Sequence, residues 1–230
     1  MPDRLTIELF SDVLCIWAWA AQVRIDQLKN DYGARVRLEY RFIPVFGAAH
    51  ARIEQAWKTR DGYTGFNRHL LEVASGWDHV QLNPDVWRHT RPHSSIPAHL
   101  CLKAVQQLEQ AGELGSRDGK ETPLESFLRR VRRAFFEQAR DIGRREVLEE
   151  LIQEQNLPLD KVRQCLDDGS AAAALHLDTE ARDRYQIPGS PTLIFNEGRQ
   201  RLYGNVGYRI IEANIRELLD DRHHGLASWC

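Results

Sequence analysis

The sequence predicts an α/β fold in which a small sheet domain is interrupted by a long helical segment. Apolar and polar residues alternate near both ends of the 230-residue chain, whereas the middle has helical periodicity. Neither end holds enough strands for a stable sheet, so strands from both ends are expected to share one. The predicted division is a sheet domain made of residues 1–48 and 187–230, with an inserted helical domain over residues 49–186.

The first elements form a strand–helix–strand unit. The alternating residues 4–10, "RLTIELF", predict a strand, and residues 36–44, "VRLEYRFIP", predict a second one. Between them we expect a helix that Ser11 or Asp12 caps and Gly33 ends. This order favours parallel pairing of the two strands.

The middle of the chain is predicted to be helical. Thr122, Pro123 and Glu125 form a capping-box pattern at the start of one amphipathic helix. The basic run at 129–133, "RRVRR", is assigned to the solvated face of that helix. Further helices are expected at residues 96–111, 144–155, 158–168 and 171–185.

The last part of the chain returns to strands. "PTLIF", the turn "NEG" and "RQRLYG" predict a β-hairpin over residues 191–204. A final amphipathic helix is expected at about 208–221.

Composition excludes several classes of partner. Lys plus Arg (31) nearly balance Asp plus Glu (33), for a formal charge of -2, so neither nucleic acid nor membrane is expected as a partner. The first residues lack the apolar core of about 7–15 residues that a signal peptide carries. We therefore expect a cytoplasmic protein, with the oligomeric state left open.

The four cysteines are far apart and form no CxxC pair; they are Cys15, Cys101, Cys165 and Cys230. This spacing argues against a disulfide scaffold and against a zinc site. His89 and His93 have metal-like spacing, but Pro92 interrupts a helix there and no acidic or cysteine partner is adjacent. No metal site is expected.

Three stretches together resemble one protein family. They are "SDVLCIWA" at 11–18, "FFEQARDIGRREVLEELIQEQNL" at 135–157 and "IPGSPT" at 187–192. In this order they resemble the DsbA-like branch of the thioredoxin superfamily, in which a helical domain is inserted into the thioredoxin fold. The nearest members are cytosolic oxidoreductases with an S-D-x-x-C-P-W-C motif. The resemblance implies a thioredoxin-like α/β fold with an inserted all-helical domain.

The resemblance also assigns site residues. It implies that Cys15 is the catalytic thiol and that Pro191 follows a cis peptide bond. Ile16 replaces the family's proline and Ala18 replaces its second cysteine, so the dithiol cycle is lost. The expected substrate-binding residues are Ser11, Asp12, Ile16, Trp17, Ala18, Ser190 and Pro191.

A lone Cys15 leaves two interpretations open. Free N–H groups at a helix start favour its thiolate, whereas Asp12 and apolar neighbours disfavour it, so the direction of the net pKa shift stays open. The alternative is that Cys15 is a buried thiol without chemistry. Cys230 is the candidate for a remote resolving thiol.

The expected function is that of a thiol-disulfide oxidoreductase or disulfide isomerase that works through one thiol. Glutathione or another external thiol is expected as co-substrate, and the substrate would be a disulfide in a protein or a small molecule. One alternative is a glutathione-dependent isomerase or transferase like the 2-hydroxychromene-2-carboxylate isomerases and kappa-class transferases of this branch. The other is a non-catalytic binding module. Aromatic residues of the insertion are expected to line a ligand groove or to pack in the core; they are Trp57, Tyr63, Phe66, Trp77 and Trp87.

Overall fold

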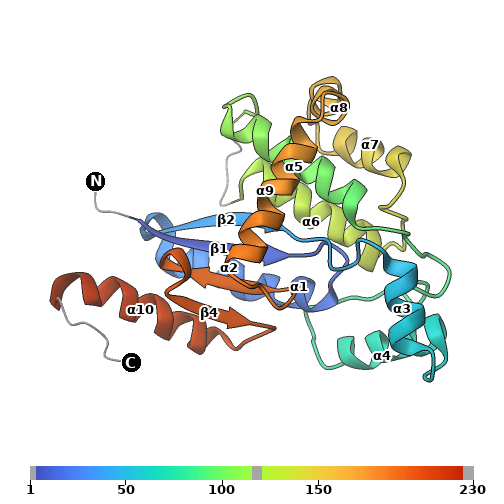
Figure 1. Cartoon of the computed structure of the whole chain (residues 1–230), viewed down its shortest axis with the longest axis horizontal. Helices are drawn as coiled ribbons and strands as arrows, with labels where there is room; N and C mark the ends of the chain where they lie inside the picture. The colour runs from blue at the N-terminus through green and yellow to red at the C-terminus, as the bar shows by residue number, and fades with distance from the viewer. Residues whose placement is uncertain (1–3, 116–120, 225–230) are drawn as a thin grey trace.

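The computed structural model describes residues 4–115 and 121–224 (Figure 1). At its centre is a sheet made of β1 (Leu5–Ser11), β2 (Val36–Phe42), β3 (Thr192–Phe195) and β4 (Gln200–Tyr203). The strand order is β2-β1-β3-β4; β1 is parallel to β2, and the other two pairs are antiparallel. Strands from both ends of the sequence therefore share one sheet, and the predicted parallel pair and hairpin are confirmed.

Apolar alternation places β1 in the core. Leu5, Ile7 and Leu9 are buried, and Leu9 lies between Tyr40 of β2 and Leu193 of β3. A strand paired on both sides and buried this thoroughly has a fixed register, since a shift of one residue would turn its apolar side chains to the other face. The position of the residues that follow β1 is fixed accordingly.

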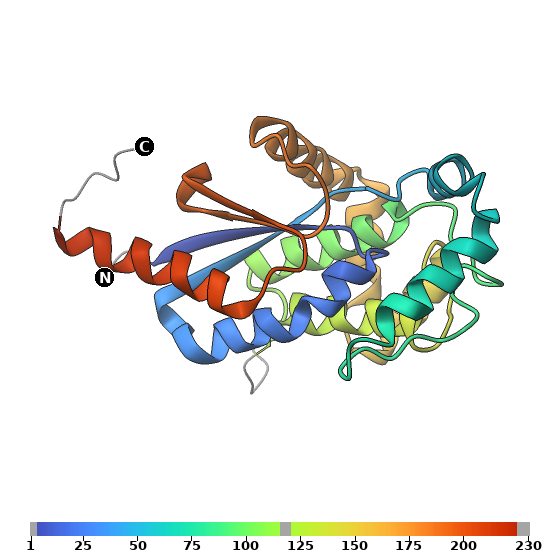
Figure 2. The same ribbon diagram turned by 90° about the horizontal axis from the view of Figure 1, so that it is seen from below.

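Two helices, one from each end of the sequence, pack on one face of the sheet (Figure 2). The chain after β1 forms α1 (Ile16–Ala20) and α2 (Gln22–Tyr32), and α10 (Tyr208–His224) packs against α2 and β1. Figure 2 shows α2 and α10 on one face of the sheet, with α9 (Ser170–Arg184) on the opposite side. As predicted, Gly33 ends α2, with a positive φ of 49° that glycine adopts without strain.

The predicted cap of the first helix is wrong. Cys15 is the N-cap residue of α1, and it makes no side-chain capping bond. Asp12 does not cap α1 because its carboxylate accepts hydrogen bonds from the backbone N–H of Leu14 and Phe46 and from the Ser95 hydroxyl. Ser11 is also engaged elsewhere, since its hydroxyl accepts a hydrogen bond from Arg132.

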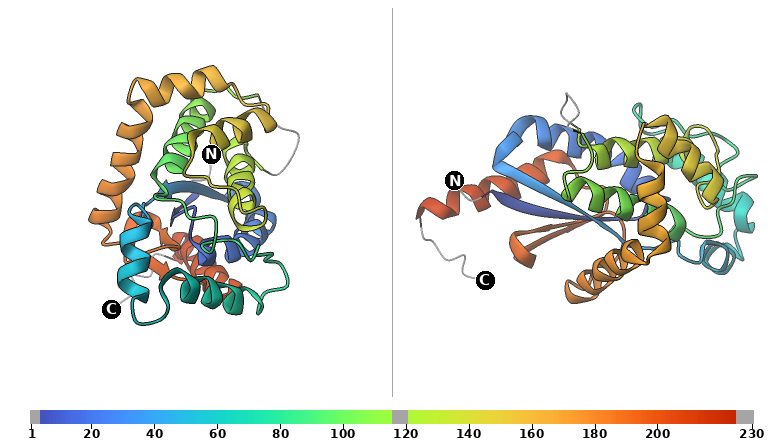
Figure 3. Two further views of the ribbon diagram at one scale, coloured as in Figure 1. Left: turned by 90° about the vertical axis from the view of Figure 1, so that its right-hand side faces the viewer. Right: turned by 90° about the horizontal axis from the view of Figure 1, so that it is seen from above.

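The middle of the sequence folds as helices. They are α3 (Ala49–Trp57), α4 (Gly62–Ala74), α5 (Ile96–Gln110), α6 (Pro123–Phe136), α7 (Arg145–Glu154), α8 (Leu159–Asp167) and α9. Figure 3 shows α5 to α8 gathered at one side of the molecule, with α3 and α4 apart from them. The division at residues 48/49 and 186/187 remains a prediction. Within the described ranges, no helix is long and apolar enough to cross a membrane.

Helix α6 confirms one prediction and contradicts another. Thr122 and Glu125 make both hydrogen bonds of the predicted capping box. The assignment of the whole run 129–133 to a solvated face is wrong, because Arg132 is only 1% exposed. Arg132 lies four residues from Leu128 and from Phe136, both buried, and so belongs to the apolar face.

Candidate functional site

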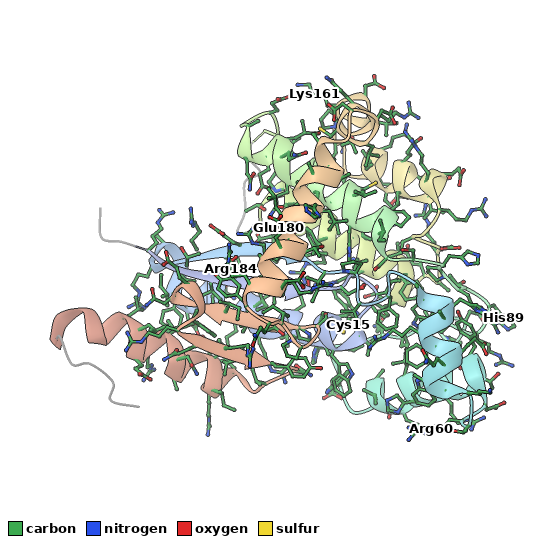
Figure 4. All side chains as sticks on the ribbon, in the orientation of Figure 1. Cys15, Arg60, His89, Lys161, Glu180 and Arg184 are labelled. Carbon is green, nitrogen blue, oxygen red and sulfur yellow. The ribbon has the colours of Figure 1, made fainter. Side chains whose placement is uncertain are left out.

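Cys15 lies between the sheet and the inserted helices, as Figure 4 shows. The turn that follows β1 closes with a hydrogen bond from the Cys15 N–H to the Asp12 carbonyl, 3.1 Å. The Cys15 thiol donates to the backbone carbonyl of Ser190, 3.2 Å away. The peptide bond between Ser190 and Pro191 is cis, as predicted. Segments about 175 residues apart in the sequence therefore meet at this thiol.

Asp12 holds the surrounding segments together. Its backbone N–H donates to the Ser190 hydroxyl at 2.9 Å. One carboxylate oxygen accepts from Phe46 N at 2.7 Å and from the Ser95 hydroxyl at 2.8 Å. The other accepts from Leu14 N at 2.8 Å. A fully buried carboxylate is retained only when such donors replace water, so Asp12 fixes the geometry around Cys15.

His99 of α5 is a further buried partner of the Cys15 turn. Its Nε2 accepts a hydrogen bond from the Val13 N–H at 3.1 Å and lies 3.7 Å from Asp12 Oδ1. Burial lowers the pKa of His99, so the ring is neutral at pH 7 and can accept this bond. The sequence did not mark His99, because it lies four residues before Lys103 and seven before Gln106 and so outside the apolar stripe of α5; only the structure shows that this face is buried.

Cys15 opens onto a cleft of about 990 Å³. Its walls come from the turn before α1, the segment after β2, helices α3 and α4, the end of α9 and the loop before β3. Its lining includes Cys15, Trp17, Arg52, His69, Arg182 and Tyr203. The volume matches sites that bind small molecules, which fall at about 300–1,000 Å³.

The cleft combines aromatic walls with positive charge. Trp17 is 40% exposed and contacts Trp77 edge-on at 5.1 Å between ring centroids, and Tyr203 is 56% exposed. The residues that line the cleft include Arg52, His69 and Arg182. In the described part of the chain, no aspartate or glutamate is among them. An anionic ligand with some apolar surface would complement these walls.

The aromatic residues of the insertion divide between the two expected roles. Trp57 and Phe66 line the cleft, whereas Trp87 is fully buried and packs against Phe46 and Phe135. The groove and the core are therefore built from one continuous aromatic cluster.

The predicted binding residues lie at two depths. Cys15, Ile16, Trp17 and Ser190 line the cleft. The others are buried and lie outside the lining; they are Ser11, Asp12, Ala18 and Pro191. A ligand in the cleft would touch the residues of the first group. The residues of the second group are buried beneath the lining and hold the first group in place.

Burial raises the pKa of the Cys15 thiol, and the Asp12 carboxylate raises it further. Hydrogen bonds from the Ser190 side chain and from the backbone N–H groups of Ala18 and Trp17 act in the opposite direction without reversing the shift. The direction left open by the sequence is therefore upward. At neutral pH Cys15 is mainly a thiol.

The other candidate residues from the sequence form no functional site within the described part of the chain. Burial raises the pKa of Cys101 to about 12, which makes it inert. His89 lies beyond α3, far from Cys15 (Figure 4), and among the residues at 4–115 and 121–224 no cluster of three metal-ligating side chains occurs. Cys230, the candidate resolving thiol, lies outside the described residues.

Comparison with known proteins identifies relatives along the whole chain. The ClpXP adapter protein SpxH of Bacillus subtilis is 26% identical over 231 residues, which cover 94% of this chain and 68% of that protein. The crystal structure of a probable DsbA oxidoreductase, SCO1869 of Streptomyces coelicolor, superposes with a TM-score of 0.73 at 16% identity, covering 99% of this chain and 94% of that one. Cytosolic disulfide reductase DsbM of Pseudomonas aeruginosa superposes with a TM-score of 0.62 at 19% identity, covering 92% and 99%.

The structural likenesses confirm the predicted thioredoxin-like fold. The family model described as "DSBA-like thioredoxin domain" matches residues 6–216, which include Cys15, the helical middle and the cis-proline loop. The chain belongs to the DsbA-like thioredoxin domain family.

Proposed function

We propose that the protein is a cytoplasmic thiol-disulfide oxidoreductase that works through Cys15 alone and uses glutathione as its external thiol. The observation that carries the proposal is the contact between the Cys15 thiol and the Ser190 carbonyl, 3.2 Å, at the wall of an open cleft. A disulfide in the cleft would reach Cys15 while its backbone paired with the cis-proline loop.

The reaction balances with one protein thiol. The Cys15 thiolate attacks the glutathione sulfur of a mixed disulfide, forms a Cys15–glutathione disulfide and expels the substrate sulfur as a thiolate, which takes up a proton. An external glutathione thiolate then attacks the bound glutathione sulfur, forms glutathione disulfide and returns Cys15 as a thiolate. The net result is release of the substrate as a free thiol, while its glutathionyl group and one external glutathione leave together as glutathione disulfide.

The charge of the cleft supports glutathione over a neutral thiol. Glutathione carries two carboxylates and one ammonium group near pH 7. The cleft lining offers Arg52 and Arg182 on different helices and includes no aspartate or glutamate in the described part of the chain. Arg182 also pairs with the exposed Asp183 at 2.7 Å, so Arg52 is the less engaged of the two cations.

The experiment that tests the proposal follows turnover of a small mixed disulfide of glutathione. The full chain should reduce it with excess glutathione, and Cys15→Ser should abolish the rate, because no other thiol lines the cleft in the described part of the chain. Cys101→Ala is the matched control and should retain the rate. Equal rates for wild type and Cys15→Ser would contradict the proposal. Tight glutathione binding without turnover or adduct would instead favour the isomerase or transferase alternative.

A non-catalytic binding module is the second candidate. The raised pKa of Cys15 and the alanine at position 18 favour it, since docking needs no nucleophile. The Bacillus subtilis relative is named as an adapter for ClpXP, and exposed Trp17 and Tyr203 are the kind of residues that anchor protein interfaces. Binding of a polypeptide that is equal in wild type and Cys15→Ser, with no turnover in either, would support this candidate.

A further inference from the structure

Arg132 is a buried cation without a carboxylate partner in the part of the chain that the structure describes. Its guanidinium donates to Gln22 Oε1 at 3.0 Å and to Ser11 Oγ at 3.2 Å, and both acceptors are neutral. Its Nε has no hydrogen-bond partner among the described residues. An unpaired charge that is only 1% exposed is costly, so a group that balances it in some state of the protein is expected.

The position of Arg132 points to the Cys15 turn. Ser11 is the last residue of β1 and Gln22 the first residue of α2, so the guanidinium lies behind the loop and short helix that carry Cys15. Burial lowers the pKa of Arg132 to about 10, and negative charge on Tyr40, Cys15 or Asp12 raises it. Tyr40 stays protonated, because burial and Glu125 raise its pKa well above the ordinary value.

Two anions therefore remain as partners. Asp12 is already held by the three hydrogen bonds from Leu14, Phe46 and Ser95. The Cys15 thiolate accepts hydrogen bonds from the Ser190 side chain and from the N–H groups of Ala18 and Trp17, but these do not offset its burial, so its charge is the one left without full compensation.

We propose that Arg132 is a positioning residue for Cys15: its buried guanidinium is the counter-charge of the Cys15 thiolate. This role rests on the thiol exchange proposed above. When Cys15 loses its proton to solvent, a second negative charge forms near buried Asp12, and Arg132 limits the resulting cost. The stabilisation acts through the field of the guanidinium and needs no direct contact with substrate.

Other charged groups near Cys15 act more weakly. His99 of α5 is neutral at pH 7. On the cleft side, Arg52 of α3, His69 of α4 and Arg182 of α9 are partly or fully exposed, so solvent and salt screen them. On α6 itself, Arg129 repels Arg132 but is held by Asp26 and Glu121. Asp12 and Arg132 are thus the two fully buried charged groups near the Cys15 turn, and they act on the thiolate with opposite sign.

The test measures the apparent pKa of Cys15 from the pH dependence of iodoacetamide labelling, quantified on the Cys15 peptide of the full chain. Arg132→Gln removes the charge but can still hydrogen-bond, and Arg132→Lys keeps the charge. The matched control is Arg133→Gln, next along α6, whose side chain is 53% exposed. We expect Arg132→Gln to slow labelling about tenfold near pH 8, Arg132→Lys to slow it by less than about threefold, and Arg133→Gln to leave it unchanged.

An Arg132→Gln variant with native circular dichroism and a wild-type labelling profile would overturn the proposal. Should that variant not fold, Cys15→Asp and Cys15→Asn decide the question with Arg132 in place. Relative to Cys15→Asn, the folding equilibrium constant of Cys15→Asp should fall by no more than about tenfold between about pH 4 and about pH 8, because burial raises the pKa of the new carboxyl and the guanidinium limits that rise. A fall that continues at about tenfold per pH unit over this range would contradict the role of Arg132. Labelling with iodoacetamide needs no glutathione. The test of Arg132 can therefore be interpreted even if the protein does not exchange with glutathione.

Discussion

Opposing influences set the reactivity of Cys15. Burial and Asp12 raise its pKa, whereas the Ser190 side chain and the N–H groups at the start of α1 lower it. Helix N-termini favour thiolates by fixed partial charges, but α1 has only five residues and its dipole is correspondingly weak. The thiol form therefore predominates at neutral pH, and Cys15 becomes a nucleophile only in its minor thiolate form.

The raised pKa gives a pH profile. Only the thiolate reacts with iodoacetamide, and below the pKa its fraction rises about tenfold per pH unit. Labelling of the Cys15 peptide should therefore increase about tenfold from pH 7 to pH 8 and continue to rise beyond about pH 9. A plateau below about pH 8 would show that the pKa is lowered instead.

Position 18 decides whether a mixed disulfide persists. Ala18→Cys supplies the second thiol one helical turn after Cys15, so it should attack a Cys15–glutathione disulfide and release glutathione. We expect an internal disulfide after oxidation by glutathione disulfide, seen by mass spectrometry as no net addition and two fewer free thiols. Because Ala18 is 4% exposed, the added sulfur should also cost about 1–3 kcal/mol of folding free energy. Persistence of the glutathione adduct in Ala18→Cys would contradict this account.

At the scale of elements, one buried carboxylate joins the helices to the sheet. Asp178 of α9 accepts from the Phe42 N–H of β2 at 2.8 Å and from Lys103 Nζ of α5 at 2.9 Å. Arg41 of β2 lies 3.3 Å from its other oxygen. This link holds α9 over the sheet, and the end of α9 supplies Arg182 to the cleft.

Loss of the Asp178 carboxylate should destabilise the whole assembly. Asp178→Ala leaves the buried Lys103 ammonium without its anion, and we expect a loss of about 3–5 kcal/mol in the free energy of unfolding. Urea denaturation followed by circular dichroism measures it. Asp183→Ala on the same helix, whose side chain is 65% exposed, is the control and should change stability by less than about 1 kcal/mol. Equal losses in both variants would contradict the link.

Local sequence patterns predicted an element correctly where the groups that interact are close neighbours in the sequence. The capping box of α6 needs only Thr122 and Glu125, three residues apart, so sequence spacing sufficed. The cap at Ser11 or Asp12 failed because distant groups, Arg132 and Phe46, take up those side chains. Burial of Arg132 was missed because a charge pattern suggested solvent, although its spacing from Leu128 and Phe136 matched the apolar face.

At the scale of the whole molecule, the sequence predicted order and pairing but not the cleft. Periodicity and the shortage of strands at each end were enough to expect one shared sheet. The cleft brings together side chains from α3, α4, α9 and the loop before β3, and no local sequence pattern predicts that these segments lie side by side. Arg52, His69 and Arg182 therefore emerged only from the structure.

The most direct test of the central claim is the intact mass of the protein after exposure to glutathione disulfide. Wild type should gain the mass of one glutathionyl group, mapped to the Cys15 peptide, and excess glutathione should remove it. Cys15→Ser should gain nothing at that peptide. An unmodified Cys15 in folded wild-type protein, at a pH where its thiolate labels with iodoacetamide, would contradict a single-thiol glutathione cycle.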